Sequence, residues 1–110
     1  TAQAMLGATK NPVLFNGDFE LQELAKKIGK ESDFEHTNVA IYFGENGKKS
    51  SDPYFNGKGP ERSGCTFCGG CMTGCRYNAK NTLDKNYLYL AQQLGTKIIA
   101  ENEVFNVLPI

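Results

Sequence analysis

Residues 64–94 are GCTFCGGCMTGCRYNAKNTLDKNYLYLAQQL. Four cysteines (Cys65, Cys68, Cys71 and Cys75) fall within eleven residues of this stretch, at C-x2-C-x2-C-x3-C spacing. Such a run forms a metal site, a disulfide-linked knot, or a turn that packs within something larger. The rest of the chain is needed to choose between these interpretations.

The cysteine spacing by itself matches that of an iron–sulfur protein. Thiolates two and three residues apart bring several soft ligands within reach of one ion, as in the C-x2-C-x2-C-x3-C-P run of bacterial ferredoxins. Here Arg76 replaces the proline after Cys75, and the second run of a two-cluster ferredoxin is missing. Four-cysteine zinc sites usually form from two separated pairs. A metal on these cysteines is therefore the alternative, and a glycine-rich turn with free or disulfide-paired cysteines is favoured.

The composition fits one small domain with no net charge. The chain has 110 residues, of which 40% are hydrophobic, and 12 basic and 12 acidic residues give a formal net charge of zero. This balance gives no long-range attraction to nucleic acid. No apolar run approaches the roughly 18 residues of a membrane span, and residues 1–10 do not have the pattern of a signal peptide. Because all four cysteines lie in one loop, a reducing compartment and a cytoplasmic location are expected.

Two segments have the periodicity of an amphipathic helix. Apolar residues recur at helical spacing from Leu21 to Ile28, which predicts a helix over residues 18–29 with Asp18 as its cap. A second apolar stripe predicts a longer helix over residues 78–94. Its members are Ala79, Leu83, Tyr87, Leu90, Ala91 and Leu94.

Three short segments are predicted to be strands, at residues 38–43, 96–100 and 103–108. A long loop, residues 50–64, is rich in glycine and proline and is expected to lie against a partner surface. These elements predict an α+β fragment. A helix, a glycine turn and a strand form half of an α/β unit, and 110 residues do not supply its parallel partner strands.

The chain is expected to be a single fragment of a larger protein. Residues 1–63 supply an N-terminal arm, a helix, a strand and the long loop, and residues 64–110 supply the cysteine-rich turn, the long helix and two strands. The sequence also begins without methionine and stops directly after the last predicted strand, which agrees with an excised piece.

No residue of this chain is predicted to be catalytic. His36 is the only histidine, lies in a polar stretch and has no evident serine or cysteine partner. Neither G-x-G-x-x-G nor G-x-x-x-x-G-K-[ST] occurs, so the chain lacks a nucleotide-phosphate loop. Arg76 and Lys80 flank the start of the predicted helix, where an anion would be favoured, although solvated charges are the commoner case there.

Beyond these patterns, about the last fifty residues resemble a known family. The resemblance rests on Gly64–Leu83, Asn86–Ala91, Gly95–Ile99 and Glu103-Val104. These residues resemble the bacterial, cholesterol-oxidase-like branch of the glucose–methanol–choline (GMC) flavoprotein oxidoreductases, of which the cysteine run is typical. A looser likeness reaches back through residues 52–55 and 39–44 to the N-terminal arm.

The resemblance implies a function that belongs to a larger FAD-binding α/β protein. In that family a Rossmann-type domain with a glycine-rich fingerprint binds FAD, and hydride passes from an alcohol to the flavin with the help of a histidine near the C-terminus. Both features would lie outside this chain. By position, the backbone of Val104 would bind the adenine of FAD. Residues 78–82 depart from the Gly-x-Arg-x-Ser that the wider family tends to show, so contacts of that turn are not carried over.

The hypothesis is therefore an internal segment of an FAD-dependent oxidoreductase that acts on the CH–OH group of a small or sterol-like alcohol. The segment contributes to FAD binding and to the substrate side, is inactive alone, and has the remainder of its own flavoprotein chain as its partner. One alternative is an electron-transfer or metal module with an iron–sulfur cluster or zinc on Cys65, Cys68, Cys71 and Cys75. Another is an interaction module that docks through residues 50–64.

Overall fold

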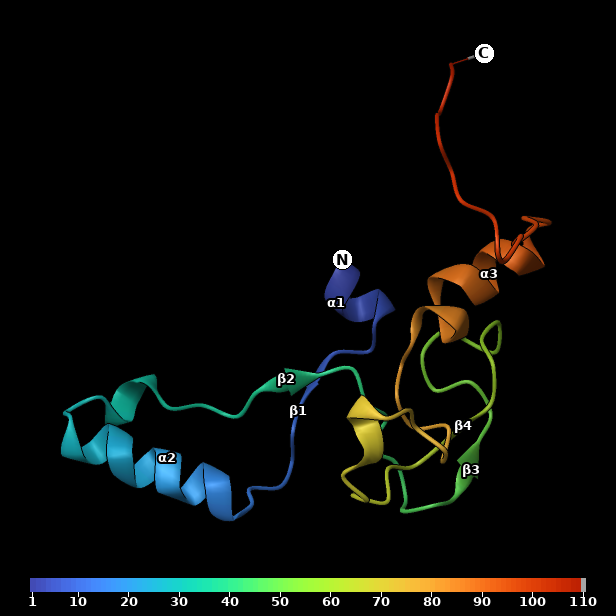
Figure 1. Cartoon of the computed structure of the whole chain (residues 1–110). Helices are drawn as coiled ribbons and strands as arrows, with labels where there is room; N and C mark the ends of the chain where they lie inside the picture. Colours follow the sequence, from blue (N-terminus) through green and yellow to red (C-terminus); the bar gives the residue numbers. More distant parts are fainter. Residues whose placement is uncertain (110) are drawn as a thin grey trace.

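The computed structural model describes residues 1–109. Short helices, single 3-10 turns and two-residue strands alternate along this part of the chain (Figure 1). In chain order they are α1 (Ala2–Met5), β1 (Thr9–Lys10), α2 (Asn16–Lys27), η1 (Glu31–Asp33), β2 (Asn38–Val39), β3 (Lys49–Ser50), β4 (Arg62–Ser63), η2 (Gly70–Met72), η3 (Leu83–Lys85) and α3 (Tyr87–Gln93).

The chain is elongated, and its helices do not share a core. Its radius of gyration is 18.2 Å, whereas a compact chain of this length has about 13 Å. In Figure 1, α2 lies at one end and the cysteine-rich region at the other, joined by the antiparallel pair β1–β2. Among residues 1–109 the only buried hydrophobic side chain is that of Ala79.

Helix α2 confirms that a helix forms where residues 18–29 predicted one, but it begins and ends two residues earlier. The Asp18 carboxylate accepts the Phe15 N–H at 2.9 Å, so it satisfies one of the donors that a helix start leaves free. Among residues 1–109, the 3-10 turn η1 is the main element in contact with α2, and Phe19, Leu24 and Ile28 are each half-exposed or more. Nearby residues therefore determine where this helix forms, but its apolar face remains largely exposed within residues 1–109.

The predicted long helix over residues 78–94 is wrong in its first half. Only Tyr87–Gln93 are α-helical, with the 3-10 turn η3 before them. Residues 79–81 run extended and pair with residues 40–42, because the Tyr42 N–H donates to Ala79 O and the Asn81 N–H donates to Ala40 O, each at 2.8 Å. This pairing between distant segments outweighs the helical pattern of the sequence.

The predicted strands are also corrected. The segment 38–43 is reduced to β2 and an isolated bridge at Ile41, and it pairs antiparallel with β1. Residues 96–100 and 103–108 form no strand, because no other described segment offers them ladder hydrogen bonds. The α+β character is confirmed, and both sheets are antiparallel.

The long loop of residues 50–64 is closed by strand pairing and by one carboxylate. Strands β3 and β4 pair antiparallel at its base, with Lys49 opposite Ser63. Inside the loop the Asp52 carboxylate accepts backbone N–H groups at 2.8–3.0 Å. The donors are Tyr54, Phe55, Gly57 and Gly59. Burial opposes ionisation of Asp52, but these donors outweigh it and lower the pKa of the carboxyl.

Gly64 leaves this loop at a point where two backbone segments nearly touch. Its N–H donates to Lys48 O at 3.1 Å and its carbonyl accepts the Gly47 N–H at 3.0 Å. A Cβ atom at Gly64 would lie 2.1 Å from the backbone oxygen of Glu45. Only glycine fits there without moving the backbone.

We therefore expect Gly64→Ala to destabilise the protein by about 1–3 kcal/mol, since an extra methyl group forces a backbone shift. Thermal unfolding of the full-length protein measures this loss. The matched control is Gly17→Ala in α2, where no other atom lies within 4 Å of the added Cβ. The control should be neutral or stabilising by about 0.5–1 kcal/mol. Equal melting temperatures for Gly64→Ala and the wild type would contradict the close approach.

Candidate functional site: a cysteine-lined apolar cavity

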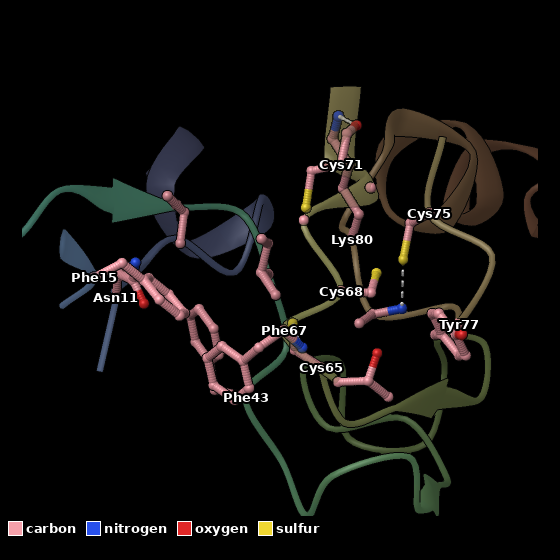
Figure 2. Close-up of a pocket in the computed structure, with 16 residues that line it drawn as sticks. Asn11, Phe15, Phe43, Cys65, Phe67, Cys68, Cys71, Cys75, Tyr77 and Lys80 are labelled. Carbon is pink, nitrogen blue, oxygen red and sulfur yellow. Dashed lines mark hydrogen bonds between the residues drawn. The ribbon is translucent and has the colours of Figure 1, made fainter. Parts of the chain in front are cut away.

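An apolar cavity of about 350 Å³ lies beside the cysteine run (Figure 2). Its walls come from the β1–α2 connection, the segment after β2, the cysteine run and the extended residues 79–80. The lining residues are Asn11, Phe15, Val39, Ile41, Phe43, Cys65, Thr66, Phe67, Cys68, Gly69, Gly70, Cys71, Cys75, Tyr77, Ala79 and Lys80. All four cysteines of the sequence motif therefore face one space.

Two aromatic rings connect the cysteine run to the strand region. Phe43 and Phe67 stack with centroids 5.7 Å apart and an interplanar angle of 20°. Phe67 adopts a positive φ of 55°, which turns the chain between Cys65 and Cys68. In Figure 2, Phe15 and Phe43 lie on one side of the cavity, and Cys68, Cys71 and Cys75 lie on the other.

The wall behind the cysteines is held by a buried arginine. Arg62 is 1% exposed, and its guanidinium donates to the Asn81 side-chain oxygen, to Ala79 O at 3.2 Å and to Asn78 Oδ1 at 3.4 Å. These bonds tie β4 to the extended segment that leaves the cysteine run. Planar donors in a fixed fork suit this arrangement, which a lysine cannot reproduce.

The arginine has no carboxylate partner within 4 Å among the described residues. Burial lowers the pKa of Arg62, while Tyr54, Cys75 and Asp84 act in the opposite direction. Its Nε and the side-chain nitrogens of Asn81 and Asn86 are buried without a hydrogen-bond partner. The charge of Arg62 is therefore stabilised by neutral oxygens, and its burial depends on each of these hydrogen bonds.

Replacing Arg62 tests this arrangement. We expect Arg62→Lys to destabilise the protein by about 2–4 kcal/mol, because a buried charge loses most of its hydrogen bonds. The matched control is Arg76→Lys, since the Arg76 side chain is exposed and forms no hydrogen bond among the described residues. Chemical denaturation of both full-length variants compares them. A shift for Arg62→Lys no larger than that of the control would contradict the role of the guanidinium.

The cysteines are all free thiols in this structure, in different surroundings. Cys65 Sγ accepts the Phe67 N–H and Cys75 Sγ accepts the Ala79 N–H, both at 3.4 Å. Burial opposes ionisation of Cys75, but backbone N–H groups of the following turn and the charge of Lys85 outweigh it and lower the pKa of this thiol. Cys75 is therefore more ionised at neutral pH than an ordinary cysteine.

The candidate metal ligands line one cavity but are not gathered around one point. Within residues 1–109, no three His, Cys, Asp or Glu side chains are placed to share a metal ion. The Lys80 ammonium donates to Cys71 O at 2.9 Å and adds a positive charge beside the thiols. Metal binding by the four cysteines stays a prediction.

The structure does not give His36, Arg76 or Lys80 the functional roles that were considered for them from the sequence. The half-buried His36 ring forms a hydrogen bond with Asn11 O at 2.7 Å, just beyond the paired residues of β1 and β2. Arg76 and Lys80 do not flank a helix start, because α3 begins only at Tyr87. No helix among residues 1–109 is long and apolar enough to span a membrane.

Val104 lies in the irregular segment that follows α3. Its side chain is 75% exposed, and its N–H and carbonyl form no hydrogen bond with other described residues. The role of Val104 in binding adenine, which the family resemblance implies, stays a prediction. The segment has no glycine-rich phosphate loop.

No pattern in the sequence indicates the buried cluster around Arg62. A single arginine in a glycine-rich loop is normally assigned to the surface. The structural role of Asp52 could have been found, because Asp-Pro followed by glycines is a turn signal in which the carboxylate bonds to nearby N–H groups.

The sequence of this chain is similar to that of known proteins named as oxidases. It is 49% identical over 99% of its length to a protein named cholesterol oxidase from Acinetobacter baumannii, and 47% identical over 89% of its length to one of the same name from Mycobacterium tuberculosis. No protein-family model matches, and neither does any solved structure. The chain spans about one-fifth of the length of these relatives, 20% and 18% respectively. It is therefore similar, along nearly all of its sequence, to one segment of proteins named cholesterol oxidase.

Proposed function

We propose that this chain is an internal segment of an FAD-dependent oxidoreductase that acts on the CH–OH group of a small or sterol-like alcohol. The observation that carries the proposal is the identity of nearly one residue in two to a fifth of a cholesterol oxidase. The printed name of those relatives supports oxidation of an alcohol by the parent protein. The segment itself supplies no catalytic residue and is inactive alone.

Exposed apolar surface supports a larger parent protein. The apolar face of α2 is uncovered, and so are the apolar residues of the segment after α3. Monomeric soluble proteins rarely leave contiguous apolar surface of this kind in water. The remainder of the flavoprotein chain is the partner that would cover it.

Within the parent, the two ends of this chain have different roles. The segment after α3 contributes the backbone of Val104 to the adenine of FAD. The cysteine-lined cavity belongs to the substrate side, because its lining is mainly apolar and an alcohol with a large hydrocarbon body needs such a surface. Bound FAD would accept the hydride that leaves the alcohol carbon.

The proposal is tested in the full-length protein. We expect it to be purified with bound FAD, identified by its absorption spectrum and by mass spectrometry of the released cofactor. Adding an alcohol substrate without oxygen should bleach the flavin. The isolated 110-residue chain should bind no FAD, because the phosphate loop is absent. A full-length protein without flavin, or one whose flavin no alcohol reduces, would contradict the proposal.

The same experiment isolates the role of Val104. Val104→Pro removes its N–H, so FAD should dissociate from the full-length protein about five- to tenfold more easily, the equivalent of about 1 kcal/mol. Val107→Pro is the control, because Val107 is exposed in the same irregular segment. Equal FAD affinity in both variants would show that the adenine binds elsewhere.

The alternative function is a small electron-transfer or metal module with an iron–sulfur cluster or zinc on Cys65, Cys68, Cys71 and Cys75. The observation that favours it is the position of all four cysteines on one cavity. Elemental analysis of the purified protein separates the two proposals. Stoichiometric iron or zinc bound by this run would support the module.

A further inference from the structure

We propose that Cys68 and Cys71 form a redox-active pair, a site of reversible disulfide formation in the wall of the apolar cavity. The inference is independent of the flavin assignment. It starts from the motif Cys68-Gly69-Gly70-Cys71, in which only two residues without side chains separate the thiols.

The first step is the geometry of the turn. The chain bends at Gly69, which has a φ of 72°, and η2 begins directly after it with Cys71 in its centre. The Cys68 sulfur lies 3.6 Å from the position that a Gly70 side chain would occupy, so it is folded back toward η2. Two glycines leave the turn free to tighten until the Cα atoms reach the separation of a disulfide.

The second step concerns which sulfurs are free to react. Cys65 and Cys75 each accept a backbone N–H, whereas the sulfurs of Cys68 and Cys71 accept no hydrogen bond from any described residue. Cys68 is exposed, and Cys71 is partly exposed. Both line the cavity with Cys75 (Figure 2). Access and freedom from other bonds therefore single out this pair.

The chemistry is thiol–disulfide exchange with a small disulfide. The exposed Cys68 thiolate attacks one sulfur of the disulfide, forms a mixed disulfide and releases one small thiol. The Cys71 thiolate then attacks the Cys68 sulfur and releases the second thiol. In total, two protein thiols and one small disulfide give one protein disulfide and two small thiols. The new bond closes the Gly69–Gly70 turn and fixes this edge of the cavity.

The sequence offers a clean assay for this pair. Trypsin cuts after Arg62 and after Arg76, so all four cysteines lie in the single peptide Ser63–Arg76. The full-length protein is incubated with oxidised glutathione, its remaining thiols are alkylated, and this peptide is analysed by mass spectrometry. We expect one internal disulfide and two alkylated thiols per peptide. If the protein is treated with dithiothreitol before alkylation, all four thiols should be alkylated.

Single variants identify the partners. Cys68→Ser should abolish the disulfide, and Cys71→Ser should trap glutathione on Cys68, because the second attack is lost. Cys65→Ser and Cys75→Ser are the controls, and each should retain the disulfide with one alkylated thiol fewer. Thiols that stay fully reduced, a disulfide that survives in both Cys68→Ser and Cys71→Ser, or a bound metal that protects all four cysteines would overturn the proposal.

Discussion

The hydrogen bonds of the Arg62 guanidinium are the interaction on which the rest of this structure depends. A charge that is 1% exposed must be solvated by the protein, and here neutral oxygens of residues 78–81 do so. These oxygens are presented correctly only because residues 79–81 run extended beside residues 40–42. One buried side chain thus joins β4, the exit of the cysteine run and the strand region in a chain that has almost no hydrophobic core.

The hydrogen bonds of Arg62 also determine the shape of the cavity. It fixes the segment after Cys75, while the Phe43–Phe67 stack fixes the segment before Cys68. The glycine-rich turn between these two points contains Cys68 and Cys71. A fixed frame around a glycine-rich turn suits both an apolar binding surface and reversible thiol chemistry. The apolar faces that remain uncovered suit a chain that completes its packing within a larger oxidoreductase.

Features encoded by neighbouring residues could be predicted from the sequence. Helix α2 has its periodicity and the Asp18 carboxylate within a dozen residues, so the sequence predicted its position to within two residues at each end. The spacing of the cysteine motif keeps the four thiols within one short turn, and all four line one cavity. The α+β character followed from the same local patterns.

Features that depend on distant residues could not be predicted. Residues 79–81 belong to a helical pattern in the sequence, yet pairing with residues 40–42 holds them extended. The apolar segments 96–100 and 103–108 have strand composition, but a strand requires a neighbour, and no described residue provides one. Arg62 is buried only because separate turns come together around it. A periodic pattern in the sequence cannot predict such an arrangement.

The central claim is that this chain is one segment of a flavoprotein whose other parts cover its apolar faces. Hydrogen–deuterium exchange tests it most directly, by comparing α2 and residues 97–109 in the isolated chain and in the full-length protein with FAD bound. The account predicts fast exchange in the isolated chain and strong protection in the full-length protein. Equally fast exchange in both would contradict it, because these faces would then remain open to solvent.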